Sequence, residues 1–93
     1  MELSYDPDKR AKTLAKRGLD FEDAVQVFAG STFDLEDDRK DYGEARWITF
    51  GLLNDRMVVV VWTPRGRTRH IISMRKANER EKKRYQSRVD RPG

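Results

Sequence analysis

The hydrophobic residues recur at helical spacing up to about residue 30. Two segments show this pattern, residues 7–17 and residues 21–29. Each segment follows an aspartate, which favours a helix start, and precedes a glycine, which favours a helix end. The flanking residues are Asp6 and Gly18 for the first segment, and Asp20 and Gly30 for the second. We therefore predict two N-terminal helices.

From residue 31 onward the hydrophobic period changes to two, which is typical of strands. In "ARWITFGLL" the alternation places Ile48 and Phe50 on one face and Trp47 and Thr49 on the other. "MVVVVWT" is apolar on both faces, as a central strand would be. The segments expected as strands are residues 32–37, 45–53, 57–63 and 68–74, with a further short strand at Leu3 and Tyr5. Short connections between them predict an antiparallel meander.

The last predicted element is a helix over about residues 76–88. Its apolar residues are few, namely Ala77, Tyr85 and Val89, so we expect a thin stripe that docks the helix loosely. The sequence thus predicts an α+β fold with two N-terminal helices, an antiparallel meander sheet of about four strands and a C-terminal helix. Residues 1–88 are expected to form a single domain, and residues 89–93 a flexible tail.

The composition excludes several classes of site. The chain has 93 residues, enough for one small domain, and contains no cysteine and one histidine. A disulfide framework, a thiolate zinc site and histidine-rich metal clusters are therefore excluded, and we expect no metal and no cofactor. No apolar stretch approaches the roughly 20 residues of a membrane span, and the first residues lack the pattern of a signal peptide. We expect a cytoplasmic protein.

Positive charge is concentrated in the last third of the chain. Residues 65–93 carry eleven Lys and Arg against three Asp and Glu, a net charge of +8, while residues 1–64 carry −4, which together give the formal +4. A basic region of this kind suggests a polyanionic partner, with nucleic acid as the first candidate and a membrane surface as the second. A solvated helix whose charges confer solubility explains the composition equally well.

Arginine dominates the last predicted strand and the turn before it, at Arg65, Arg67, Arg69 and Arg75. A guanidinium group binds phosphate oxygens through two donors and stays charged when partly covered, which suits RNA phosphate. The alternative is a charged strand edge that resists aggregation. We favour the functional interpretation.

Regular alternation would place Arg69, Ser73 and Arg75 on one face of this strand. His70 would then lie on the opposite face, with Ile72 and Met74. As the only histidine it is a candidate general base, but its position favours a structural role, and both interpretations stay open.

The segment "GEARW" brings Glu44 and Arg46 to the start of a neighbouring strand. A glutamate beside several arginines could be a base, although a salt bridge that orients the arginines is the more common arrangement. The aromatic residues Trp47, Trp62 and Tyr85 could stack on bases. A small core uses such residues routinely, and for the tryptophans a core role is favoured.

Four segments, taken in order, resemble the BrnT family: "YDPDK", "KRGLDFEDA", "GEARWITFG" and "RHIISMRKANERE" followed by Tyr85. The family is the toxin half of a bacterial type II toxin-antitoxin system and has a RelE-like fold. The resemblance implies a ribonuclease that arrests translation, neutralised by a BrnA-like antitoxin whose ribbon-helix-helix domain binds DNA. It further implies that DNA is contacted only through the antitoxin, in a complex expected to hold two toxins and an antitoxin dimer. The residues that match the family pattern are Lys9, Lys16, Glu44, Arg46, Arg69, Ser73, Arg75 and Lys76.

The chain departs from the family pattern at two positions. Arg17 stands where many members have a histidine before the glycine, and Met74 stands where a small residue is common. If that histidine accepts a proton in other members, this chain needs another base, because arginine cannot accept a proton at neutral pH.

These observations predict a metal-independent endoribonuclease in which the 2′-hydroxyl of RNA attacks the adjacent phosphorus and leaves a cyclic phosphate. Arg69 and Arg75 would stabilise the charge of the transition state, worth about 2 to 4 kcal/mol per well-placed donor. Arg46 and Lys76 would position the RNA backbone, and Glu44 is a weak candidate for the base. Tyr85 would stack on an RNA base or transfer a proton. The residues expected to bind RNA are Lys16, Arg17, Arg65, Arg67, Ser73, Lys76 and Tyr85.

The cationic cluster of the last helix is the predicted docking site for the antitoxin. Its residues are Arg80, Lys82, Lys83 and Arg84. A different class of function also fits the sequence: a non-catalytic module that tracks RNA or DNA phosphates with the basic C-terminal face. A purely structural partner protein is the third possibility.

Overall fold

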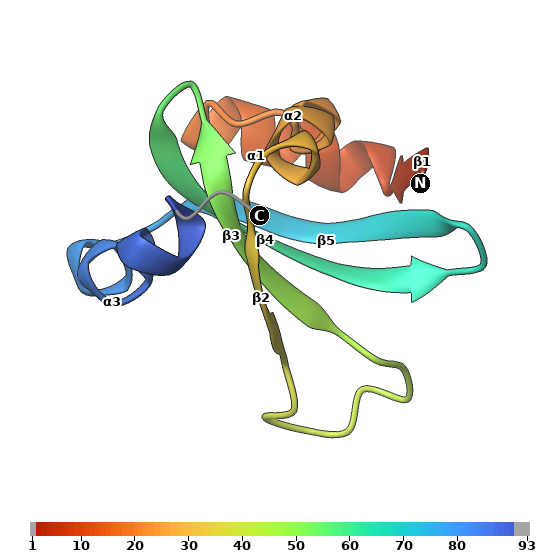
Figure 1. The fold of residues 1–93 in the computed structure, drawn as a ribbon. Coiled ribbons are helices and arrows are strands. Elements are labelled where there is room, and N and C mark those ends of the chain that lie inside the picture. Colours follow the sequence, from red (N-terminus) through yellow and green to blue (C-terminus); the bar gives the residue numbers. More distant parts are fainter. Residues whose placement is uncertain (1, 91–93) are drawn as a thin grey trace.

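The computed structural model describes residues 2–90, which form a five-stranded sheet with helices on both faces (Figure 1). The sheet order is β1-β5-β4-β3-β2. The strands are β1 (Glu2–Tyr5), β2 (Phe33–Glu36), β3 (Trp47–Leu53), β4 (Arg56–Arg65) and β5 (Thr68–Lys76). β2 to β5 form the predicted antiparallel meander, and β1 adds a fifth strand that runs parallel to β5. The α+β class expected from the sequence is confirmed.

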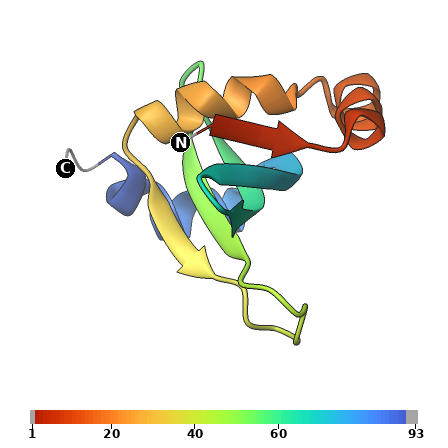
Figure 2. The same cartoon turned by 90° about the vertical axis from the view of Figure 1, so that its right-hand side faces the viewer.

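The helices are α1 (Pro7–Arg17), the 3-10 helix η1 (Phe21–Asp23), α2 (Ala24–Ala29) and α3 (Glu79–Val89). α1 has the predicted bounds, because the Asp6 carboxylate accepts a hydrogen bond at its start and Gly18 adopts φ 68° at its end. The second predicted helix is divided into η1 and α2. Figure 2 shows the sheet lying between α2 on one side and α3 on the other.

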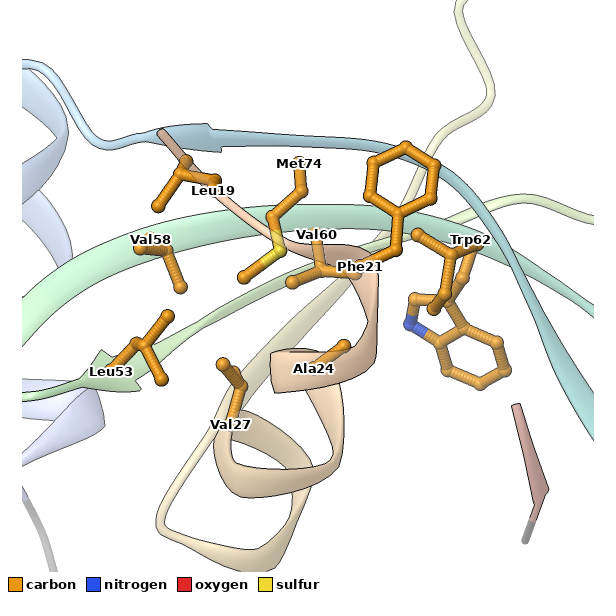
Figure 3. Packing of buried hydrophobic residues seen from close by; sticks show 10 residues of the cluster. Leu19, Phe21, Ala24, Val27, Leu53, Val58, Val60, Trp62 and Met74 are labelled. Carbon is orange, nitrogen blue, oxygen red and sulfur yellow. The ribbon is translucent and has the colours of Figure 1, made fainter. Parts of the chain in front are cut away.

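The larger core lies between the sheet and the first helices, on what we call the α2 face. Phe21, Ala24 and Val27 are fully buried against Val60 and Met74, with further residues around them (Figure 3). α2 approaches β3 closely, because a Cβ on Gly51 would lie 2.6 Å from the Val27 side chain. These contacts fix the position of the sheet relative to the N-terminal helices.

The smaller core lies on the opposite side of the sheet, the α3 face. Val89 is fully buried there, and Tyr85 packs on Phe50 at 4.3 Å and on Phe33 at 5.4 Å between ring centroids. The expected thin apolar stripe therefore docks α3 through Tyr85 and Val89. Val89, which we expected in a flexible tail, is instead the last residue of α3; of the predicted tail, residues 91–93 lie outside the described residues.

The last helix starts three residues later than predicted. Lys76 is still part of β5, and Asn78 caps the helix by accepting a hydrogen bond from the Glu81 backbone N–H while the Glu81 carboxylate accepts one from the Asn78 backbone N–H. This capping box sets the position at which the chain leaves the sheet.

A β-bulge in β5 changes the predicted arrangement of faces. Trp62 pairs with Ile71 and Val61 pairs with Ser73, so Ile72 is an extra residue. The strand therefore reverses its alternation between Ile71 and Ser73. The prediction that Arg69, Ser73 and Arg75 share one face is wrong, because Arg69 lies on the α2 face and the other two on the α3 face.

Within residues 2–90, no helix combines the length and apolar character needed to cross a membrane.

Candidate functional site

One row of polar side chains crosses the α3 face of the sheet from strand to strand. Ser4 of β1 lies opposite His70 of β5, and His70 lies opposite Thr63 of β4. Continuing the register of β3 and β4 by one residue places Arg46 opposite Thr63, whose hydroxyl donates a hydrogen bond to the Ala45 carbonyl. Neighbouring strands are about 4.8 Å apart, so His70 and Arg46 are separated by about two such steps.

The part of the sheet next to this row is not covered by a helix. Ser73, Val61, Ile48 and Leu35 form the adjacent row, and all four are only half-buried although Val61 belongs to a central strand. α3 covers the following row instead, through the contacts of Tyr85 with Phe50 and Phe33. We call these two rows, which α3 does not cover although Thr63 is itself buried, the open face.

His70 is held by Ser4, whose Oγ lies 2.9 Å from the imidazole Nδ1. Burial lowers the pKa of His70 below 6.5, and the positive charges of Arg65 and Lys9 lower it further while Glu44 opposes them. The imidazole is therefore neutral near pH 7, and its Nε2 is not engaged by the contact with Ser4. A neutral, oriented imidazole can accept a proton.

Arg46 is held against the connection between β2 and β3. Its guanidinium lies 3.8 Å from the centre of the Tyr42 ring, and its Nε is buried with no hydrogen-bond partner among residues 2–90. The Tyr42 hydroxyl donates to the buried Asp37 carboxylate, which also accepts two hydrogen bonds from the Arg39 guanidinium at 2.7 and 2.8 Å. Those bonds lower the pKa of Asp37 to about 2. The connection is thus fixed by a buried carboxylate that orients the Arg46 side chain.

Arg75 lies where the open face meets α3. Its guanidinium donates to both carboxylate oxygens of Glu81, at 2.7 and 2.9 Å, and this ion pair holds the pKa of Glu81 below its usual value. The charge of Arg39 is close enough to act on Arg75. The Arg75 guanidinium is therefore held in one orientation by Glu81 before any RNA binds.

Arg69 is separated from this group by the sheet. Its guanidinium stacks on Phe28 at 4.1 Å and on Trp62 at 5.1 Å, both on the α2 face, and its Nε is buried without a partner within the described range. Arg65 forms an ion pair with Glu44 at 3.5 Å near the row of His70. Arg67 is exposed in the turn between β4 and β5.

The remaining predicted RNA-binding residues occupy three other places. Lys16, Arg17 and Ser73 line a hollow between α1 and β5, and the Arg17 guanidinium donates to the Met74 carbonyl at 3.0 Å. Lys76 lines a separate hollow of about 560 Å³ beneath α3, together with Lys82 and apolar residues. Tyr85 is a packing residue of the smaller core.

The residues predicted to bind an antitoxin lie along α3. Arg80, Lys83 and Arg84 are exposed, and Lys82 pairs with Glu79 at 3.1 Å. The three exposed side chains give the helix a cationic surface, while Lys82 lines the hollow beside Met57 and Ala77.

Sequence reasoning missed several members of the site. The group formed by Asp37, Arg39 and Tyr42 lies in a polar stretch that gave no periodic signal. His70 is a candidate base from the sequence, but regular alternation predicts that it faces the core. The bulge at Ile72 places it on the α3 face with Ser73 instead.

The fold and the site together describe a small α+β domain that presents cations and one histidine on an open sheet face. The family model described as the ribonuclease toxin BrnT of type II toxin-antitoxin systems matches residues 5–81, which is most of the chain. The chain therefore belongs to the BrnT family of ribonuclease toxins, as its sequence motifs predicted. Membership implies an RNA substrate and an antitoxin partner. A search of curated proteins found no match.

Proposed function

We propose that RNA is cleaved on the open face, with His70 as general base and Arg46 as the main ligand of the scissile phosphate. The observation that carries this proposal is the polar row across the sheet, in which a neutral histidine oriented by Ser4 shares one face with Arg46, whose guanidinium is held on the Tyr42 ring. A base and a phosphate ligand on one accessible surface are what RNA transesterification needs.

The reaction follows from these roles. The unprotonated Nε2 of His70 takes the proton of the 2′-hydroxyl, with Nδ1–H donating to Ser4 Oγ. The 2′ oxygen forms a bond to phosphorus, the bond from phosphorus to the 5′ oxygen breaks, and the leaving oxygen takes a proton from water. The products are a 2′,3′-cyclic phosphate and a 5′-hydroxyl. The Arg46 guanidinium stabilises the extra negative charge on the phosphorane, which contributes about 3 kcal/mol for a well-placed donor.

His70 replaces Glu44 in the role of base. The Glu44 carboxylate is engaged by the Arg65 guanidinium at 3.5 Å, so it is not free to contact the 2′-hydroxyl. It lies close enough to act on the imidazole electrostatically. We propose that Glu44 and Arg65 set the electrostatic potential at the His70 imidazole and so adjust its pKa.

Arg75 and Ser73 contact the phosphate next to the scissile one. Arg75 lies on the row beyond the half-buried apolar side chains, on which a base can rest. Arg69 stabilises the packing of α2 on the sheet instead of contacting the scissile phosphate, because Phe28 and Trp62 hold it on the other face.

The antitoxin partner is proposed to be a ribbon-helix-helix protein of the BrnA type that covers the cationic surface of α3. Two toxins and an antitoxin dimer would form the complex, with DNA contacted only by the antitoxin. With RNA as substrate, the toxin acts in the cytoplasm.

The proposal is tested by incubating the purified protein with RNA in EDTA and analysing the ends of the fragments. Cyclic phosphate and 5′-hydroxyl ends are the expected result. Loss of cleavage in EDTA with recovery on adding magnesium would overturn the metal-independent mechanism. Binding of RNA without any product would favour a non-catalytic module instead.

A further inference from the structure

A cationic groove lies between α1 and the outer edge of β5. It encloses about 280 Å³ and is lined by Lys9, Lys12, Thr13, Lys16, Arg17, Ile72 and Ser73. The residues of α1 recur at spacings of three and four, so they line one side of the helix. From Lys9 to Lys16 the helix rises by about 10 Å, which gives the groove an elongated cationic wall.

The groove exists because β1 covers only part of β5. The pairing of β1 ends where Tyr5 meets Ile71, and beyond it this edge of β5 has no strand partner among residues 2–90. Two cations of α1 approach that edge: Lys9 Nζ donates to the Ile72 carbonyl at 3.3 Å, and Arg17 donates to the Met74 carbonyl. The bulged residue Ile72 and its neighbour Ser73 form the floor.

The charge of the groove is not neutralised within the described part of the chain. Lys9, Lys12, Lys16 and Arg17 form no ion pair among residues 2–90, whereas Arg10 on the same helix pairs with Asp20. A hydrogen bond to a carbonyl orients a cation but leaves its charge in place. Four uncompensated charges around one hollow favour an anion with several charges.

We propose that this groove binds successive phosphates of the RNA strand that leaves the cleavage site. The proposal rests on the proposed function of the open face. Ser73 connects the two places, because it lines the groove and lies on the α3 face beside the row of His70. The charge of Lys9 reaches His70, so the groove begins close to the proposed base. A strand that crosses the β5 edge at the bulge passes from His70 into the groove.

The test uses the exposed residues Lys12 and Lys16, which make no hydrogen bond to the β5 edge. Binding is measured with a fully 2′-O-methylated RNA, which cannot undergo attack by the 2′ oxygen. The double variant K12A/K16A is expected to bind at least about 10-fold more weakly at 0.1 M salt, and the slope of log affinity against log salt should fall by about 1.4, or 0.7 for each lost phosphate contact.

Two control variants separate the groove from general charge. K12R/K16R keeps both charges and should bind as the wild type does, while R80A/K83A removes the same charge from exposed positions of α3 and should leave RNA affinity unchanged. Unchanged affinity and slope in K12A/K16A would overturn the proposal, as would an equal loss in R80A/K83A. A loss of antitoxin affinity alone in K12A/K16A would assign the groove to the protein partner.

The same experiment distinguishes failure of the groove from failure of the proposed function. If the wild type binds methylated RNA through Lys12 and Lys16 but does not cleave ordinary RNA, the groove stands and the catalytic proposal fails. If K12A/K16A cleaves and binds as the wild type does, the groove fails and the catalytic proposal stands.

Discussion

The Ser4 hydroxyl lies 2.9 Å from Nδ1 of His70, across the only parallel strand pair among residues 2–90. Because β1 is the first element of the chain and β5 the last strand, the orientation of the proposed base depends on closure of the whole sheet. If β1 detached from β5, His70 would stay on β5 but would lose the Ser4 contact that orients its imidazole. This relationship makes Ser4 a positioning residue whose effect on rate is separable from RNA binding.

Ser4→Ala should slow cleavage by about 10-fold without weakening the affinity for methylated RNA, because the imidazole keeps its place but loses the partner that selects its tautomer. Single-turnover kinetics and binding titrations measure the two quantities separately. Equal losses in rate and affinity would indicate that Ser4 supports the surface as a whole, and not the imidazole in particular.

The cleavage rate should rise with pH and level off before pH 7. A general base acts when it is unprotonated, and burial lowers the pKa of His70 below 6.5, so the rate falls only as the pH drops below that value. Single-turnover rates between pH 4.5 and 8 measure the profile, in a range chosen around the usual histidine pKa of about 6.5. A midpoint above pH 7 would disagree with the lowered pKa.

Arg75→Ala and Glu81→Gln should act in the same direction on stability and in opposite directions on RNA affinity. Each breaks the ion pair between β5 and α3, at a cost of about 1 kcal/mol in the free energy of unfolding. Arg75→Ala removes a cation from the open face and weakens binding, whereas Glu81→Gln removes the competing carboxylate and strengthens it. Denaturant unfolding and titration with methylated RNA check both. A parallel loss of affinity in the two variants would show that only the position of α3 matters.

Asp37→Asn should destabilise the connection that carries Arg46, by about 2 kcal/mol, since it replaces a buried charged acceptor of four hydrogen bonds. Asp37 has a pKa of about 2 in the folded protein against 3.8 otherwise, so its contribution is complete above about pH 4 and is lost as the pH falls toward 2. The difference in unfolding free energy between wild type and variant, measured from pH 6 to 2, should shrink accordingly. A difference that stays constant would contradict this assignment.

The sequence predicted the elements well because their signals are local. Asp6 and Gly18 define α1 by capping chemistry alone, and the apolar run of β4 marks it as the central strand. The faces of β5 were predicted wrongly, since a bulge depends on pairing with β4 and not on the β5 sequence by itself. One extra residue at Ile72 separates Arg69 from Arg75 and brings His70 to the side of Ser73.

The sequence predicts individual site residues, but it does not predict how they are grouped in space. Some cations are neutralised by acidic residues on other elements, as Arg75 is by Glu81 and Arg10 by Asp20. These pairs depend on the tertiary structure and cannot be predicted from the local sequence. Of the residues that line the groove of α1, the sequence predicts Lys16, Arg17 and Ser73 to bind RNA, and Lys9 and Lys16 match the family pattern; the groove itself has no signal in the sequence. Lys12 gave no separate signal, since one exposed lysine on a helix is ordinary.

Reversing the charge of Lys82, Lys83 and Arg84 together should weaken antitoxin binding more than it affects folding. Lys83 and Arg84 are exposed, and the only ion pair lost among the described residues is that of Lys82 with Glu79. Association with the antitoxin should slow with rising salt in the wild type and much less in the variant. Calorimetry at two salt concentrations measures the affinity, with K12A/K16A as the control. An unchanged affinity in the triple variant would place the interface elsewhere.

The central claim is that His70 is the base of a metal-free cleavage on the open face, and the rate of His70→Gln in EDTA tests it most directly. Glutamine keeps a polar side chain of similar length toward Ser4 but cannot accept the proton. The account predicts a single-turnover rate lower by about 100-fold or more at pH 7, with no pH dependence below 7 and with unchanged affinity for methylated RNA. Cleavage at the wild-type rate by a folded His70→Gln variant would contradict it.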